Sequence, residues 1–304
     1  MARILVSGLV NIETAVRIRQ FPLPYYPVDY PFFGIRSGVS GVAFNIAKAL
    51  KTLGDEPILR AFAANDAEGT RIREELASLC ISDGHLSQDI PETPVSVVLY
   101  DGEGRRQIHC DLKDIQERTF PLESRCLEGI ELAVVCNINF NRPLLRAARD
   151  RGIPIATDVH VLSSPDDAYN REFLENADIL FLSDEGISGD REAFIRCLAR
   201  RFPAQIIVMG EGKQGASLFD RTSGAIVRLH AARADKTSNT VGAGDALFSA
   251  FLHFWLNGVR PVESLQLAET FAAAKIAVSG ASSGFISESE IRRRHAASPV
   301  EFRT

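Results

Sequence analysis

The sequence predicts an α/β protein in which helices cover both faces of a mostly parallel central sheet, a three-layer α/β/α arrangement. The first observation is that short apolar runs, typical of buried strands, alternate along the chain with amphipathic stretches of helical period. The second is size, because 304 residues with 45% hydrophobic side chains supply enough apolar surface for a large core. The third is that two segments interrupt the alternation, and these predict a small β lid beside the main sheet.

Each element of the main sheet is predicted from its local pattern. The strands are apolar runs between turn residues, expected at 3–8, 57–62, 132–136, 153–157, 179–182, 205–209, 216–220 and 225–229. The helices carry apolar side chains at helical spacing, and are expected at 38–53, 69–79, 142–151, 191–201, 246–256 and 262–278. Strands followed by helices in this way indicate parallel pairing.

The lid is predicted from two segments without helical period. Residues 16–37 are rich in proline, tyrosine and phenylalanine, and residues 96–110 have the pattern of a β-hairpin. We therefore predict one domain over residues 1–304, with lid segments at about 11–37 and 94–112. A homodimer that pairs two lids would cover their exposed edges and aromatic side chains.

Composition limits the class of protein. A net charge of −5 argues against a general nucleic-acid binder, whose surface would be basic. No apolar run reaches the length of a membrane span, and the first eight residues are too short a hydrophobic stretch for a signal peptide. The five cysteines are scattered like core residues of a reducing compartment, so we expect a cytoplasmic protein. The six histidines show no metal-ligand spacing.

Residues 239–245 carry the most specific chemical signal. Gly242 and Gly244 precede a long apolar helix, whose N-terminal N–H groups and dipole suit an anion. A carboxylate placed there to bind phosphate would repel it, so Asp245 is interpreted as a base that takes a proton from an attacking hydroxyl. The alternative is a simple helix cap with a glycine turn.

In its wider context this segment resembles the signature of the ribokinase-like (PfkB) family of sugar and nucleoside kinases. The resemblance covers about residues 3–285 and implies the ribokinase-like fold with its β lid. It implies that the backbone of Gly242, Ala243 and Gly244 holds the transferred phosphoryl group, and that Asp245 is the catalytic base.

The N-terminal part also resembles the family. Residues 38–47 are similar to its first signature, a glycine-rich helix start followed by Asn on the first turns. The resemblance implies that the acceptor sugar is bound by Gly38, Gly41, Asn45, Asn11 and Glu13. Glu13 stands where the family usually has Asp, and its extra methylene could change the hydroxyl spacing. A solvated helix residue is the alternative for Asn45.

A competing phosphate signal lies at residues 210–215, which spell Gly-x-Gly-x-x-Gly after a strand. A dinucleotide-binding turn needs a helix next, but two strands are predicted there, and Ala216 replaces the lysine of a P-loop. In the resembling family such a loop lies near the nucleotide. The resemblance implies that ATP contacts six residues: Thr240, Gly210, Gly212, Gly215, Gly280 and Ala281.

Metal binding is predicted with departures from the family. The family usually carries Asn-x-x-Glu after a central strand to place Mg²⁺, and residues 183–186 lack both side chains at those positions. Glu185 or Asp184 could take the role, since Mg²⁺ keeps several waters. A polar helix cap is the alternative. Family members often bind potassium near the Asp that opens the final motif, and Asn239 at that position predicts weak potassium dependence.

The sequence thus predicts an ATP-dependent kinase that phosphorylates a hydroxymethyl group of a small sugar or sugar derivative. One alternative is a nucleoside kinase, because five aromatic side chains of the lid could stack on a base: Tyr25, Tyr26, Tyr30, Phe32 and Phe33. Packing inside the lid or a dimer contact is the other interpretation of these rings. A non-catalytic sugar-binding relative of the same fold is the second alternative.

Overall fold

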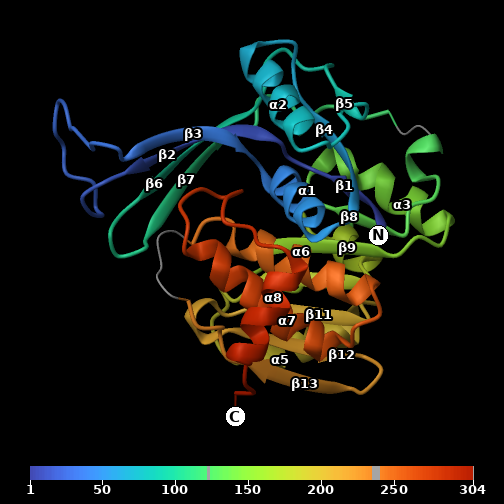
Figure 1. Ribbon diagram of the computed structural model, residues 1–304. Coiled ribbons are helices and arrows are strands. Elements are labelled where there is room, and N and C mark those ends of the chain that lie inside the picture. The colour runs from blue at the N-terminus through green and yellow to red at the C-terminus, as the bar shows by residue number, and fades with distance from the viewer. Residues whose placement is uncertain (122–123, 235–239, 304) are drawn as a thin grey trace.

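The computed structural model describes residues 1–121, 124–234 and 240–303. In these residues the main sheet has nine strands in the order β13-β12-β11-β10-β9-β8-β1-β4-β5, and neighbouring strands are parallel except in the pairs β11–β12 and β12–β13 (Figure 1). The strands are β1 Arg3–Ser7, β4 Glu56–Phe62, β5 Leu86–Ser87, β8 Leu132–Val135, β9 Ile155–Val161, β10 Ile179–Ser183, β11 Ile206–Gly210, β12 Ala216–Asp220 and β13 Ala225–Leu229.

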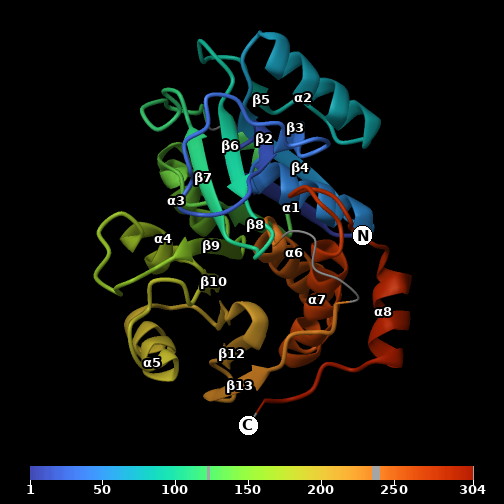
Figure 2. The same cartoon turned by 90° about the vertical axis from the view of Figure 1, so that its left-hand side faces the viewer.

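Helices lie on both faces of this sheet, which confirms the three-layer prediction (Figure 2). One layer contains α1 Val42–Leu53, α6 Ala243–Leu256, α7 Pro261–Ile276 and α8 Glu288–Ala297, and the other contains α3 Arg142–Asp150, α4 Arg171–Asn176 and α5 Arg191–Arg201. Helix α2 Ala67–Ser78 packs against the small sheet, and 3₁₀ turns occur at Ser124–Leu127, Asn139–Asn141 and Gly212–Gln214. A separate apolar core lies on each face of the main sheet.

Parallel pairing determines where polar side chains collect. Strands β8 and β10 are almost wholly buried, as expected for strands covered on both faces. Their carboxyl ends, together with those of β1, β9 and β11, lie at one edge of the sheet. Ligands of open α/β sheets bind outside this edge.

No helix in the described part of the chain is long and apolar enough to cross a bilayer.

The two segments predicted as a lid form a separate sheet, with strands β2 Asn11–Arg17, β3 Ile35–Ser40, β6 Val95–Tyr100 and β7 Arg106–Asp111 in the order β3-β2-β6-β7. It projects from the body in Figure 1. The predicted helix at 38–53 starts later, at Val42, because residues 38–40 pair with β2 and Gly41 ends that pairing. We call these four strands the small sheet.

The aromatic side chains between β2 and β3 lie on the outside. Tyr25 is 88% exposed and Phe33 is 96% exposed, so these rings do not fill a core of the small sheet. The cysteines also divide: Cys126 and Cys136 are buried, but Cys80 and Cys110 are exposed. The prediction that all are core residues is therefore wrong for the last two.

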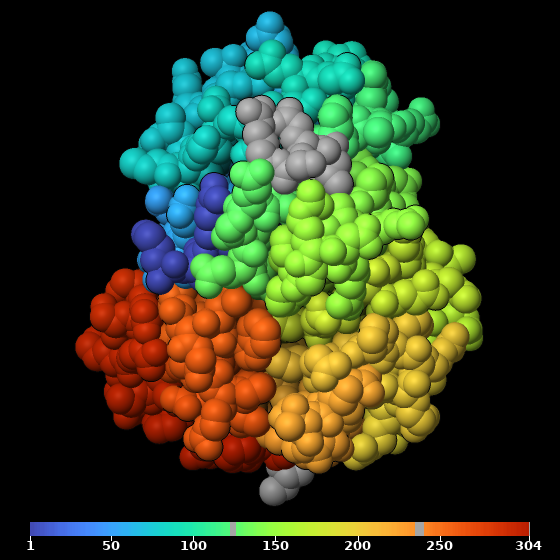
Figure 3. Space-filling view, turned by 90° about the vertical axis from the view of Figure 1, so that its right-hand side faces the viewer, coloured from blue at the N-terminus to red at the C-terminus, as the bar shows by residue number. Residues whose placement is uncertain are grey.

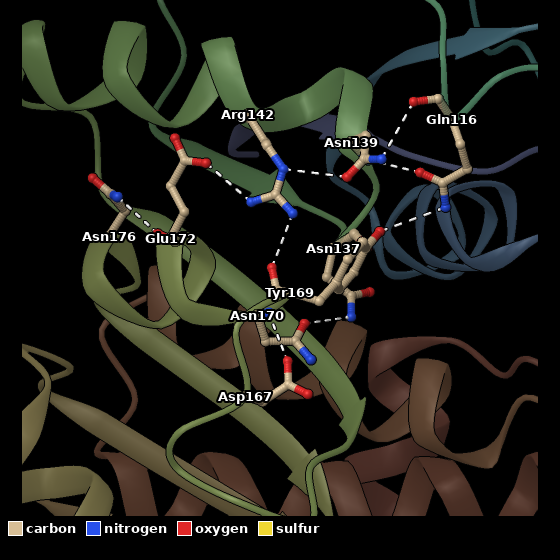
Figure 4. A network of polar contacts seen from close by, with 9 residues as sticks. All are labelled: Gln116, Asn137, Asn139, Arg142, Asp167, Tyr169, Asn170, Glu172 and Asn176. Carbon is tan, nitrogen blue, oxygen red and sulfur yellow. Dashed lines mark hydrogen bonds and ion pairs between the residues drawn. The ribbon is translucent and has the colours of Figure 1, made fainter.

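A polar network joins three connections on the α3 side of the sheet (Figure 4). Asn137 donates to Asn170 at 3.0 Å, and Arg142 reaches Glu172 at 3.0 Å. Gln116 contacts the Tyr169 hydroxyl at 3.5 Å. These side chains satisfy one another's hydrogen-bonding groups, so the network holds the loops together.

The face of the molecule away from the small sheet carries the first third of the chain above the last third (Figure 3).

Candidate active site

The start of α6 presents the backbone of the predicted catalytic motif. Gly242 caps the helix with φ of +77°, and a Cβ on it would lie 2.3 Å from the Ala281 carbonyl oxygen. Only glycine fits this conformation and this contact. The Ala243 N–H donates to the Thr240 carbonyl at 3.1 Å, which closes the turn. Gly244 is exposed, with open space where a side chain would start, so a ligand can approach the backbone there.

Asp245 stands on the first turn of α6 and is only 9% exposed. Burial raises the pKa of its carboxyl, and the charge of Asp158 raises it further. A hydrogen bond from Asn45 and the charges of His160 and Lys275 act in the opposite direction. The Asn45 Nδ2 donates to Asp245 Oδ2 at 2.7 Å. The carboxylate is therefore held in one orientation and is more basic than an exposed one.

The residues predicted to bind the acceptor come from three adjoining elements. Asn11 and Glu13 lie on β2, with Gly38 of β3 directly opposite Glu13. Gly41 caps α1, and Asn45 follows on the first turn of that helix. The structure therefore brings this set to one place, and the bond from Asn45 connects it to Asp245.

Two buried oxygens in this set have no partner among the described residues: Asn11 Oδ1 and Asn45 Oδ1. The amide nitrogen of Asn11 donates to Ser96 at 2.9 Å, and that of Asn45 is used by Asp245. Buried polar atoms normally have a hydrogen-bond partner, and an amide oxygen accepts from a hydroxyl. The orphaned oxygens therefore suit a ligand with hydroxyl donors.

Glu13 adds a second carboxylate to the same region. Burial raises the pKa of Glu13, while the hydrogen bond from Ser40 and the charge of Lys275 lower it, and the charge of Asp245 raises it. The Ser40 hydroxyl donates to Glu13 at 3.2 Å. The carboxylate is thus partly buried and can accept from a ligand hydroxyl.

The glycine-rich turn at 210–215 is followed by β12 and β13, which confirms that it is not a dinucleotide-binding or P-loop motif. Gly212 begins a short 3₁₀ turn, and a Cβ on Gly215 would lie 2.1 Å from the Leu229 carbonyl oxygen. Glu211, between Gly210 and Gly212, bonds to both Ser217 and Arg303. The conformation of this turn is therefore determined by the chain itself.

The second predicted nucleotide segment adjoins the first turn of α6. Gly280 has φ of +103°, and the backbone of Ala281 packs directly against Gly242. Ser282 next to it donates to the Val39 carbonyl at 3.2 Å. This turn therefore bridges the α6 start and the small sheet.

The candidate metal residues have different environments. Asp184 pairs with Arg191 at 2.8 Å, so part of its acceptor capacity is already used. Glu185 is exposed and lies 3.5 Å from Arg106. No ready-made cluster of three or more metal-ligating side chains occurs in residues 1–121, 124–234 and 240–303. Mg²⁺ needs only one or two carboxylates beside phosphate oxygens and waters, so Glu185 fits it. Asn239 lies outside the described residues.

Sequence reasoning missed two cationic residues at the site. Arg106 on β7 donates to the Thr240 hydroxyl at 2.9 Å, which links the small sheet to the α6 start. Lys275 is wholly buried on α7, and its ammonium donates to the Val241 carbonyl. The one available signal for Lys275 was a single lysine among alanines at the end of an apolar helix.

Comparison with known proteins gives matches over most of the chain. Residues 1–288 match the pfkB family carbohydrate kinase profile. The chain is 25% identical over 289 residues to the ATP-dependent ribose-1-phosphate kinase of Halopiger xanaduensis, covering 93% of this chain and 95% of that protein.

Solved structures share the fold. A microbiome-derived acarbose kinase superimposes with a TM-score of 0.86 at 23% identity, covering 97% of this chain and 99% of its own. A nucleoside kinase of Burkholderia thailandensis, solved with inosine, superimposes with a TM-score of 0.80 at 19% identity, covering 98% and 99%. The match over almost the whole chain shows that this protein belongs to the PfkB family of carbohydrate kinases.

Proposed function

We propose that this protein transfers the γ-phosphoryl group of ATP to a hydroxymethyl group of a small sugar or sugar derivative. Asp245 takes the hydroxyl proton as the hydroxyl oxygen forms its bond to the γ-phosphorus. The bond from that phosphorus to the bridging oxygen breaks, and ADP leaves. Most of the rate comes from positioning and electrostatic stabilisation, as is usual in phosphoryl transfer.

The observation that carries the proposal is the placement of Asp245. Its carboxylate is buried on the first turn of α6, beside the Gly242–Gly244 backbone, and is oriented by Asn45 at 2.7 Å. A helix N-terminus attracts the phosphates, and the carboxylate next to it receives the proton. A simple helix cap would not require an aligning donor from a second helix.

The acceptor class is inferred from the surroundings. The orphaned oxygens of Asn11 and Asn45, with the Glu13 carboxylate, accept hydrogen bonds, so the ligand must offer several donors. A polyhydroxyl molecule has this property. Ribose 1-phosphate is the first sugar derivative to test, because a relative at 25% identity is named for it.

Magnesium, when bound, would neutralise phosphate charge, and Glu185 would hold it directly or through water. The small sheet would act as a lid. Its Arg106 already reaches Thr240, and closure over the acceptor would exclude water and protect ATP from hydrolysis. Hydrogen exchange would test this role, with protection gained in residues 16–37 and 96–110 when acceptor binds. Equal protection in both states would remove it.

Release of ADP, measured by a coupled assay across pentoses, hexoses, their phosphates and nucleosides, tests the proposal. A phosphorylated sugar product is expected. Preference for nucleosides would favour the alternative within this fold. The aromatic Tyr26, which could stack on a base, lines a hollow of 270 Å³ together with ten other residues of β2, β3, β6 and the loop after β2. The four proposed acceptor and catalytic side chains do not line this hollow: Asn11, Glu13, Asn45 and Asp245. Sugar binding without turnover would indicate a non-catalytic relative.

A further inference from the structure

A lysine is buried beside the candidate catalytic centre. Lys275, on the last turn of α7, has no exposed surface, and its ammonium donates to the Val241 carbonyl. A buried ammonium is costly unless it is paired. The charged groups that act on it through space are Asp245 of α6, Glu13 of β2 and Arg106 of β7. Two carboxylates and one backbone carbonyl thus compensate a single buried cation.

The carbonyl that accepts this bond belongs to the peptide unit that precedes the α6 cap. A trans peptide is planar, so its C=O and N–H point in opposite directions. A cation that holds the Val241 oxygen therefore also fixes the direction of the Gly242 N–H. The same cation polarises the peptide and makes this N–H a stronger donor.

The geometry points to Lys275 as a positioning residue. Its ammonium acts as a fixed internal cation that orients the Val241–Gly242 peptide toward the transferred phosphoryl group and balances the negative charge of Asp245. This inference rests on the proposed function of the site. It gives a cationic role to a side chain that touches neither nucleotide nor acceptor, and acts through Gly242.

The ammonium must carry its proton to perform this role. Burial lowers the pKa of Lys275 to about 8, although the charges of Asp245 and Glu13 raise it, and Arg106 lowers it. The positioning cation is therefore present below about pH 8 and is lost as pH rises through that value. The kcat of the wild-type protein should fall over the same range.

The test compares four variants. Lys275→Met keeps the length and removes the charge, Lys275→Arg keeps the charge at every pH, and Lys275→Ala opens space. The matched control is Lys48→Met on α1, which removes a lysine paired with Glu75 at 3.0 Å outside the site. The kcat and KM of each variant are measured from pH 6 to pH 10, at intervals of about one pH unit.

We expect Lys275→Met to lower kcat on the order of 10-fold to 100-fold, with little change in acceptor KM. This loss is smaller than that expected from removing a backbone N–H that binds the phosphoryl group. The kcat of Lys275→Met should no longer fall as the pH rises through about 8. Methylammonium should restore part of the activity of Lys275→Ala at constant ionic strength, whereas tetramethylammonium, which is too large, should not. Lys48→Met should behave as wild type.

Binding of ADP with aluminium fluoride, which mimics the transferred phosphoryl group, gives a readout separate from turnover. Lys275→Met should weaken this complex more than it weakens ADP alone. If the wild-type protein is active on no acceptor, the proposed function is wrong. If wild type and Lys275→Met bind ADP with aluminium fluoride equally well, the role proposed for Lys275 is wrong. If Lys275→Met does not fold, two other results can still overturn the inference. One is a wild-type kcat that does not fall as the pH rises above about 8. The other is that methylammonium has no effect on the activity of Lys275→Ala.

Discussion

Helices α1 and α6 begin in the same way but provide different chemistry. Each follows a glycine with positive φ, +102° at Gly41 and +77° at Gly242. In both, a Cβ on the glycine would collide with a backbone carbonyl, 2.5 Å from Leu9 and 2.3 Å from Ala281. Neither helix has a side-chain cap. At both helix starts the glycine backbone thus lies close to another backbone segment, and the side chains determine what each start does.

The difference lies in charge. The first turn of α6 carries the acid Asp245, whereas α1 has no acidic residue there and carries the amide Asn45. The buried Lys275 bonds to the residue before the α6 cap. An amide meets hydroxyls without repelling them, and a carboxylate with a nearby cation can accept a proton beside phosphate. This difference supports the proposed roles, in which the α1 start binds the acceptor and the α6 start carries out the transfer.

Removing the charge at α6 should have the largest effect. Asp245→Asn is expected to lower kcat on the order of 10²–10⁴-fold, because it removes the proposed general base while it keeps the shape of the side chain. Calorimetry should show acceptor affinity close to that of wild type. Near-native turnover would rule out Asp245 as the base.

Changes on the acceptor side should separate two roles. Asn45→Ala loses the donor to Asp245 and the proposed acceptor contact, so kcat should fall and the acceptor KM should rise, by roughly 1–3 kcal/mol in kcat/KM. Glu13→Ala should raise the acceptor KM and leave kcat and the KM for ATP nearly unchanged. Unchanged acceptor affinity in both variants, by calorimetry, would show that the acceptor binds elsewhere.

Cβ atoms at the two glycines should destabilise both helix starts. Gly41→Ala and Gly242→Ala are each expected to lower the free energy of unfolding by roughly 1–3 kcal/mol, since each combines a positive φ with a close carbonyl. Gly244→Ala is the matched control, because open space surrounds that position. Denaturant unfolding measures all three. A control that is as unstable as the others would contradict the explanation.

Potassium should have the smallest effect. Asn239 lacks the charge of the usual acid, and Lys275 already supplies a cation next to Val241, so added potassium should change the rate of the Mg²⁺-dependent reaction by less than about twofold. The measurement is the rate with and without potassium at fixed ionic strength. A several-fold increase would contradict this prediction.

Local pattern alone was sufficient for most of the fold. Strands at 216–220 and 225–229 have the predicted bounds, and the α6 motif lies at a helix start as expected. Short or polar elements such as α4 and α8 were missed, because few apolar side chains mark their period. The α1 start was misplaced by four residues, since pairing between β2 and β3 decides it.

The contacts that define the candidate site were decided by tertiary structure. Asn45 and Asp245 are 200 residues apart, and Arg106 and Thr240 are 134 apart. The sequence alone indicated Asp245 and Asn45 as candidates, because glycine, carboxylate and amide patterns are local, but it did not indicate Lys275. It could not determine that Asn45 aligns Asp245 or that Lys275 binds the Val241 carbonyl. Those contacts depend on how α1, α6 and α7 pack together, and that packing is set by the combined apolar surface of elements distant in sequence.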